Sequence, residues 1–290
     1  MTPRNSPTVW RRWLAAELKG LREAKGLHQK DVGRECGWSG ARLSYLEHGQ
    51  QVPTEDDLDQ LLPLYGVAGD EVSPFYEAVK FAREKGWWER YDDRIVPPYV
   101  AHYIGLEQGA SMIRTVEPLI VPGLLQTRDY IVANLRNDIT PRTEHHIAQI
   151  ADVRIARQDA LTSDPPLELR AVIDESVLLR MVGRPDVMAA QLEQIAAMAE
   201  RPNVEVRVFP FEKGVNQGMA GPYRILSFGP QEPSVLYIEH RDGGNYHEEA
   251  VKLDEHILAF DHLLGSTWSS AESISYIMET ARKYANRPTG

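Results

Sequence analysis

The sequence predicts two domains of different fold class: an all-α N-terminal domain with five helices, and an α+β C-terminal domain with a small sheet of about four strands. Apolar residues recur at spacings of three and four through residues 1–85, which is typical of amphipathic helices around a shared core. Several later segments alternate apolar and polar residues instead, as strands with one buried face do. We therefore expect an N-terminal domain at 1–85, a linker at 86–100 and a C-terminal domain at 101–290.

The N-terminal helices are predicted from their apolar stripes and from residues that start or stop a helix. Leu14, Leu18 and Leu21 fall on one face of the first helix, and Gly26 ends it. Thr54 can cap the fourth helix, whose first turn carries the acidic residues that a helix N-terminus favours. The expected helices are Val9–Ala24, Gln29–Glu35, Gly40–Glu47, Glu55–Tyr65 and Pro74–Lys85.

The stretch from Gln29 to His48 has the spacing of a helix-turn-helix motif. Gly33 is the small residue that lets the two helices lie close together, and Gly37 stands where the turn needs a left-handed backbone. In such a motif the second helix enters the major groove of DNA. Cys36 is the only cysteine of the chain, and we expect it to pack in the core rather than to react. The apolar positions between the helices are Val32, Cys36, Trp38, Leu43 and Leu46.

The candidate DNA-binding residues are the positions that remain when the core positions of this motif are removed. Arg42 can make a bidentate contact to guanine or bind a phosphate, and Ser44 and Tyr45 can hydrogen-bond to bases or phosphates. Gln29 opens its helix, where backbone amides can meet a phosphate, and Lys30 lies beside it. The full predicted set is Gln29, Lys30, Ser39, Gly40, Ala41, Arg42, Ser44 and Tyr45.

The distribution of charge is compatible with DNA binding at one end of the chain. Residues 1–50 contain nine Lys or Arg and five Asp or Glu, a formal charge of +4, whereas the whole chain carries −10 and the remaining 240 residues −14. A basic segment on an acidic protein indicates contact with phosphates through that segment. We expect the acidic remainder to weaken non-specific DNA binding.

The C-terminal domain is predicted to mix helices and strands. A Gly-rich loop at Phe209–Gly221 could carry binding residues, and so could Asp174 and Glu175 after a strand end. The candidate strands are Leu167–Ile173, Val204–Pro210, Tyr223–Phe228 and Val235–Glu239. Helices are expected at Tyr103–Glu117, within Val121–Leu135, and at Thr143–Leu161, Asp174–Arg180, Pro185–Glu200, Glu248–Leu264 and Ala271–Tyr284.

Composition and motifs argue against several other classes of protein. No apolar run approaches the roughly 20 residues that span a bilayer, and the N-terminus lacks the apolar core of a signal peptide, so we expect a cytoplasmic protein without membrane contact. The sequence contains no phosphate loop, no paired CxxC motif and no histidine spacing typical of a zinc site. We therefore expect no enzymatic activity, no catalytic residue, no cofactor and no bound metal.

Residues 29–53 resemble the Cro/C1-type, or XRE, helix-turn-helix. They share its opening Gln, small residue, turn Gly and trailing Pro, together with the run LSYLEHG at 43–49. Most of the remaining chain is similar to the domain of unknown function that follows this module in actinobacterial WhiJ-like regulators. Matching segments are YIGLEQGA (103–110), VPGLLQTRDY (121–130), the Arg154–Arg157–Gln158 spacing, VIDESVLLRMVG (172–183), MAAQLEQI (188–195), NVEVRVFPFEKG (203–214), GPYRILSF (221–228) and VLYIE (235–239).

The resemblance implies a DNA-binding transcriptional regulator whose C-terminal domain binds a small acidic or neutral partner protein, usually encoded nearby, as in toxin–antitoxin pairs. Gly40 and Ala41 depart from the long polar residues that many relatives place early in the recognition helix. This departure moves the expected base contacts to Arg42, Ser44 and Tyr45. We also expect a homodimer on a palindromic operator, because one small motif reads only a few base pairs.

The residues of the C-terminal domain leave its role open. A protein-partner domain is favoured by the resemblance. A small-molecule sensor would need an enclosed apolar pocket with a few converging polar groups, and an enzyme would need clustered ionisable side chains with shifted pKa values in a cleft. Dimerisation through the apolar closing helices is a further interpretation.

Overall fold

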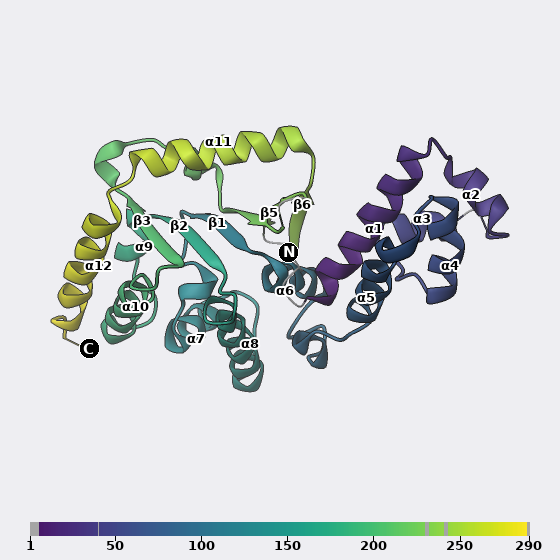
Figure 1. Cartoon of the computed structure of the whole chain (residues 1–290). Helices are drawn as coiled ribbons and strands as arrows, with labels where there is room; N and C mark the ends of the chain where they lie inside the picture. The colour runs from purple at the N-terminus through teal and green to yellow at the C-terminus, as the bar shows by residue number, and fades with distance from the viewer. Residues whose placement is uncertain (1–5, 40, 230–231, 241–242, 289–290) are drawn as a thin grey trace. The chain divides into compact units, whose positions relative to one another are not determined.

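The computed structural model of the chain describes residues 6–39, 41–229, 232–240 and 243–288. The contacts between residues divide the chain into two compact units, Met1–Arg90 and Tyr91–Gly290, which we describe separately (Figure 1). No helix within the described ranges is both long and apolar enough to cross a membrane.

The first unit is built from helices throughout. Its α-helices are α1 (Pro7–Ala24), α2 (Gln29–Glu35), α3 (Arg42–Glu47), α4 (Glu55–Leu64) and α5 (Ser73–Ala82). Short 3-10 turns lie between α4 and α5 at Gly69–Glu71 and after α5 at Trp87–Arg90. Helix α2 has the predicted bounds, whereas α3 begins two residues after the predicted start. The predicted starting residue, Gly40, lies outside the described residues.

The core of the first unit joins the helix-turn-helix pair to the other three helices. Leu18, Leu58 and Leu61 are fully buried in it, and the rings of Trp10 and Phe81 stack with their centroids 5.4 Å apart. Burial of one leucine side chain contributes about 1.5–3 kcal/mol relative to an exposed one, so this cluster dominates the stability of the unit. Helices α2 and α3 therefore share one hydrophobic core with α1, α4 and α5.

The second unit combines helices with one mixed sheet. Its helices are α6 (Pro98–Gly109), α7 (Arg128–Arg136), α8 (Glu144–Arg157), α9 (Glu175–Leu179), α10 (Pro185–Met198), α11 (Ala250–Ser266) and α12 (Ser270–Ala285). Its strands are β1 (Met112–Glu117), β2 (Glu168–Asp174), β3 (Val204–Phe209), β4 (Tyr223–Ser227), β5 (Val235–His240) and β6 (Gly243–His247). Short 3-10 turns lie at Gly123–Leu125, Gln158–Leu161, Phe211–Lys213 and Gln217–Ala220.

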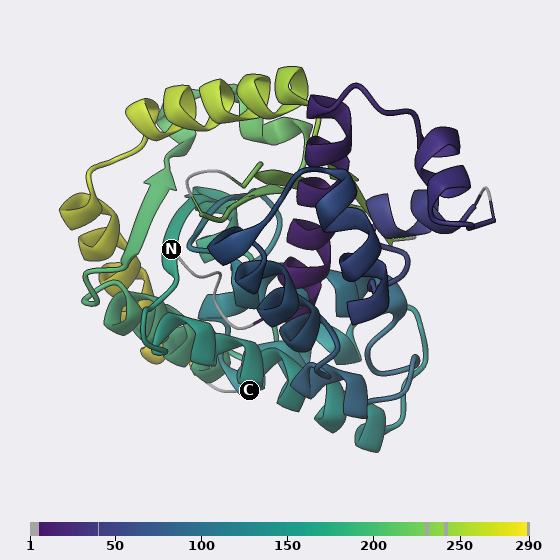
Figure 2. The ribbon, with the colours of Figure 1, turned by 45° about the vertical axis from the view of Figure 1, so that its right-hand side comes forward.

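The six strands are arranged in the order β3-β2-β1-β4-β5-β6. The pairs β1–β2 and β2–β3 are parallel, and the other three pairs are antiparallel. Helix α11 lies along one face, where Leu253, Phe260 and Leu263 pack against strand residues such as Ile225 and Leu236 (Figure 2). Helices α7, α8 and α10 lie on the opposite side of the sheet (Figure 1).

The predicted number of about four strands is wrong, because the sheet has six. Strand β1 lies inside the helix predicted at Tyr103–Glu117; helix α6 ends at Gly109, and the chain turns extended at Ala110. Strand β6 was not expected because its sequence, GGNYH, has two glycines and one β-favouring residue. Both strands are specified by pairing with neighbours that are distant in sequence or that lie across a hairpin, which local patterns do not report.

Candidate functional site

The turn between α2 and α3 has the backbone that the motif requires. Gly37 has φ +66°, in the left-handed region that only glycine enters without strain, which confirms the predicted role of this residue. The Trp38 backbone N–H then donates to the Gly33 carbonyl oxygen at 2.7 Å. The chain thus leaves α2 in a closed turn and enters α3 in a fixed direction.

A buried polar cluster joins α1, α2 and α3. Arg22 donates to both carboxylate oxygens of Glu47 at 2.6 and 3.0 Å, and both residues are buried. Gln29 donates its side-chain N–H to the same carboxylate at 2.7 Å. The hydrogen bond from Arg22 to Glu47 raises the pKa of the guanidinium. This cluster fixes the inner face of α3, and the sequence offers one signal for it, since Arg22 follows Leu18 by one helical turn.

Three of the predicted DNA-binding residues, Arg42, Ser44 and Tyr45, lie on α3. Tyr45 is 44% exposed, Arg42 and Ala41 are exposed, and Ser44 is half-buried with its hydroxyl 3.3 Å from the His48 ring. On the other side of the turn, Ser39 and Lys30 are exposed and Gln29 is half-buried. Five of the eight predicted residues thus lie in the turn or on α3, Gln29 and Lys30 lie at the start of α2, and Gly40 lies outside the described residues.

Arg42 has a protein partner in addition to its exposure. Its Nη2 donates to the Asp57 carboxylate at 2.6 Å, and its guanidinium lies 4.8 Å from the centroid of the Trp38 ring. Asp57 is also the third residue of α4, where it completes a capping box with Thr54. A guanidinium has five N–H donors in a fixed fork, so this contact orients Arg42 and leaves other donors for a ligand.

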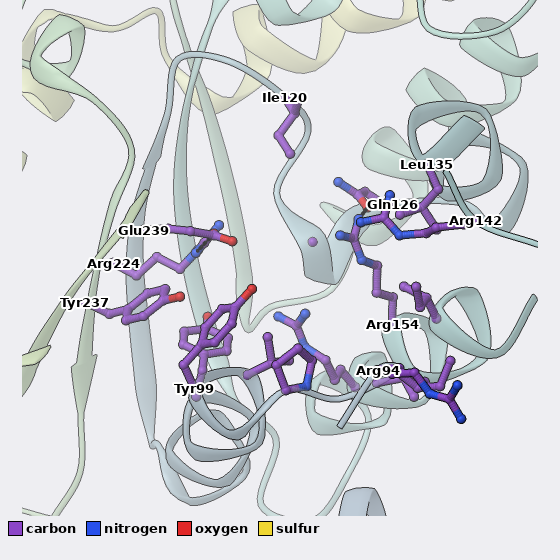
Figure 3. A pocket seen from close by; sticks show the side chains of 18 residues that line it. Arg94, Tyr99, Ile120, Gln126, Leu135, Arg142, Arg154, Arg224, Tyr237 and Glu239 are labelled. Atoms are coloured by element: carbon purple, nitrogen blue, oxygen red, sulfur yellow. Dashed lines mark hydrogen bonds and ion pairs between the residues drawn. The ribbon is translucent and has the colours of Figure 1, made fainter. Parts of the chain in front are cut away.

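The second unit contains a cavity of about 200 Å³ on the face of the sheet opposite to α11. Figure 3 shows Arg224, Tyr237 and Glu239 on one side of this cavity and Gln126, Arg142 and Arg154 on the other. The charged side chains in its lining are five arginines and one carboxylate. They are Arg94, Arg142, Arg154, Arg157, Arg224 and Glu239. The Gly-rich loop expected to carry binding residues, Phe209–Gly221, contributes nothing to this lining, and neither do Asp174 and Glu175.

Two of these arginines, Arg157 and Arg224, are held in place by ion pairs with carboxylates. Arg157 donates to both oxygens of the fully buried Glu107 at 2.7 and 2.8 Å. Arg224 donates to Glu117 and to Glu239, each at 2.8 Å. Burial opposes ionisation of Glu239, but Arg224, together with the charges of Arg157 and Arg154, outweighs burial and lowers the pKa of this carboxyl. Glu239 is therefore a charged acceptor at neutral pH.

Arg154 differs from its neighbours because it has no carboxylate partner within salt-bridge distance in the described residues. The one side-chain hydrogen bond of Arg154 among the described residues is long, 3.5 Å from Nη1 to the Gln126 side-chain oxygen. Burial, with Arg157 nearby, lowers the pKa of Arg154 to about 10, so the guanidinium remains a cation at neutral pH. The Glu239 carboxylate offsets part of this charge from a distance. A cation without a direct ion-pair partner at a partly enclosed site is costly, and a bound anion would reduce that cost.

The described residues offer no group of three or more His, Cys, Asp or Glu side chains arranged to hold a metal ion. The chemistry available in the cavity is therefore that of guanidinium and phenol donors around one carboxylate. Burial raises the pKa of Tyr237, so its hydroxyl stays protonated and can donate.

A packed helical unit with an anchored α2–α3 pair and a polar outer face on α3 defines a protein of the helix-turn-helix class. Residues 13–75 match the family described as a helix-turn-helix domain, which indicates a DNA-binding regulator. Residues 100–279, more than half of the chain, match the family described as a domain of unknown function (DUF5753), and the chain belongs to that family. No curated protein and no solved structure matches the chain.

Proposed function

We propose that the chain is a sequence-specific transcriptional regulator that reads duplex DNA with α3. The observation that supports this proposal is the division of α3 into two faces: Leu43, Leu46 and Glu47 are buried, whereas Arg42 and Tyr45 are exposed. A helix anchored in this way can present side chains to base edges, which differ for every base pair in the major groove. The sequence resemblance adds that the motif is of the XRE type and that the chain is WhiJ-like.

The proposal includes two copies of the chain on a palindromic operator. Such a site would have half-sites about one helical turn apart, roughly 10 base pairs or a multiple of it. The second unit would be the regulatory part. The arginine-lined cavity favours control by a small molecule, and the resemblance favours control by a small, antitoxin-like partner protein.

Replacement of Arg42 tests the reading of DNA. An operator would first be selected from genomic fragments with the full chain, and binding would then be followed by fluorescence anisotropy. Arg42→Ala is expected to weaken operator binding by about 1–3 kcal/mol, the usual scale for a base-reading arginine, with little change on a random duplex. An equal loss on both duplexes would make Arg42 a phosphate contact.

Two variants serve as controls. Asp57→Asn removes the charge of the Asp57 carboxylate but keeps the Arg42 guanidinium, so operator binding should change much less than in Arg42→Ala. Arg136→Ala removes an exposed arginine of the second unit and should leave binding unchanged. If wild-type protein selects no fragment over random DNA, sequence-specific binding is excluded.

A further inference from the structure

We propose that the cavity lined by Arg154, Arg142, Tyr237 and Glu239 binds a small anionic molecule with a phosphate or carboxylate group, and that Arg154 holds this group. The regulatory role of such a ligand rests on the proposed function. Binding itself does not, because it can be measured in the absence of DNA.

The first argument is the state of Arg154. Arg157 and Arg224 are each satisfied by buried carboxylates at 2.7–2.8 Å, and Arg142 is paired with Asp138 at 2.6 Å. Arg154 has a single, long side-chain hydrogen bond to an amide oxygen within the described residues. Its guanidinium can offer two parallel N–H donors, the geometry that phosphate and carboxylate groups accept. Among the described arginines that line the cavity, Arg154 has no carboxylate within salt-bridge distance and feels only the more distant charge of Glu239, so an anion bound here would give it a direct partner.

The second argument is the arrangement of donors around the empty volume. The Tyr237 and Tyr99 side chains point into the cavity from the side opposite to Arg154 (Figure 3). Both carry a hydroxyl that can donate to an anion. The hydroxyls and the guanidinium come from β5, α6 and α8, so residues from three elements converge on one space.

The third argument concerns size and the opposite end of the ligand. A volume of about 200 Å³ is smaller than the roughly 300–1,000 Å³ of sites for drug-sized ligands, which fits a small metabolite. Glu239 lies across the cavity from Arg154 and uses one oxygen, Oε2, to accept from Arg224. A ligand with a hydroxyl or amine donor at the end remote from its anionic group would complement this carboxylate.

Calorimetric titration and thermal unfolding of the full chain with simple anions test the proposal. Inorganic phosphate and succinate serve as separate probes, because they distinguish a phosphate ligand from a carboxylate ligand, and sodium chloride at matched ionic strength is the blank. We expect at least one of the two anions to bind and to raise the melting temperature above the blank. Arg154→Gln should weaken that binding by about tenfold or more, the scale of a hydrogen bond to a charged group.

Three variants separate binding from structure. Arg154→Gln should unfold at the same temperature as wild type, or higher, in anion-free buffer, since it removes a largely buried cation that has no direct ion-pair partner in the described residues. Arg154→Lys keeps the charge but loses the fork, so it should retain part of the binding. Arg128→Gln removes an exposed arginine of the same unit that does not line the cavity, and it should bind the probe as wild type does.

Several outcomes would overturn the proposal. They are equal binding by wild type and Arg154→Gln, stabilisation no greater than that of sodium chloride, or loss of stability in Arg154→Gln without a change in anion binding. Binding of an acidic peptide with no response to either small anion would assign the cavity to a protein partner instead. None of these results depends on operator binding, so the two proposals can fail separately.

Discussion

At the scale of single residues, the hydrogen bonds around Glu47 determine how α3 is presented. Glu47 accepts from Arg22 on α1 and from Gln29 on α2, and none of its side chain is exposed. A buried ion pair is costly to form, but removal of one partner leaves the other charge without compensation. The carboxylate therefore couples the stability of the unit to the orientation of its DNA-reading helix.

Glu47→Ala is predicted to destabilise the first unit by about 3–5 kcal/mol, because Arg22 would remain buried without its main partner. Urea unfolding of the full chain, followed by circular dichroism, would measure the loss. The double variant Arg22→Met/Glu47→Leu should recover most of it, since no buried charge is left. Asp31→Ala removes the exposed pair with Arg34 and should cost less than about 1 kcal/mol. A Glu47→Ala protein as stable as Asp31→Ala would contradict this account.

The sequence predicts which of these residues lie on the surface better than it predicts their partners. Gln29 is expected to meet a phosphate, and in the structure its amide donates to Glu47. Arg42 is expected on the reading face; it is exposed there and also pairs with Asp57, fifteen residues further on. Helical periodicity distinguishes inward from outward positions, but the choice of acceptor depends on how the helices pack.

At the scale of elements, strand β6 shows how one glycine supports the wall of the cavity. A Cβ atom on Gly244 would lie 2.2 Å from Cε2 of the Tyr237 ring, so the ring occupies the space that a side chain would fill. The Tyr237 ring in turn packs against the Tyr246 ring at 40° between the planes, with centroids 4.9 Å apart, and it lines the cavity. One of the two glycines that made β6 unlike a strand in sequence, Gly244, thus gives the Tyr237 ring of β5 its space.

Gly244→Ala is predicted to destabilise the second unit by about 1–3 kcal/mol, the usual cost of overpacking, because Tyr237 must move. Displacement of that ring should also weaken binding of the anionic probe. Gly265→Ala is the matched control: it lies in α11 with no atom within 4 Å of the added Cβ, and alanine in a helix should stabilise by roughly 0.5–1 kcal/mol. Thermal unfolding of both variants checks the difference, and an equal response would refute the proposed role of Gly244.

The sequence pattern of a single strand or helix can predict some residues of the cavity lining, but it cannot predict that they come together. Strand alternation places Tyr237 and Glu239 on one face of β5, and i, i+3 spacing places Arg154 and Arg157 on one side of α8. Both patterns could have indicated polar groups that face inward. Their meeting requires the pairing of β5 with β4 and the placement of α6 and α8 around the same cavity, which no local pattern specifies.

At the scale of the whole molecule, charge is divided unequally along the chain. Residues 1–50 carry +4, but residues 1–90 carry −1, because the segment after α3 is acidic, and residues 91–290 carry the remaining −9. DNA phosphates are attracted to the basic segment at short range, and the acidic remainder of the protein repels them at longer range. The balance between the two should depend on ionic strength.

The full chain is predicted to bind random duplex DNA about tenfold more weakly than a fragment of residues 1–90 at 50 mM salt. The difference should shrink as salt rises, since the Debye length falls from about 10 Å at 0.1 M to about 3 Å at 1 M. Fluorescence anisotropy across a salt series measures, for each protein, the slope of log binding constant against log salt concentration. Circular dichroism confirms that the fragment is helical. Because short-range contacts through residues 1–50 are common to both proteins, the number of phosphates contacted, and hence the limiting slope at high salt, should be the same. Tighter non-specific binding by the full chain would mean that the acidic unit itself contacts DNA, and the assignment of phosphate contacts to the first 50 residues would then be wrong.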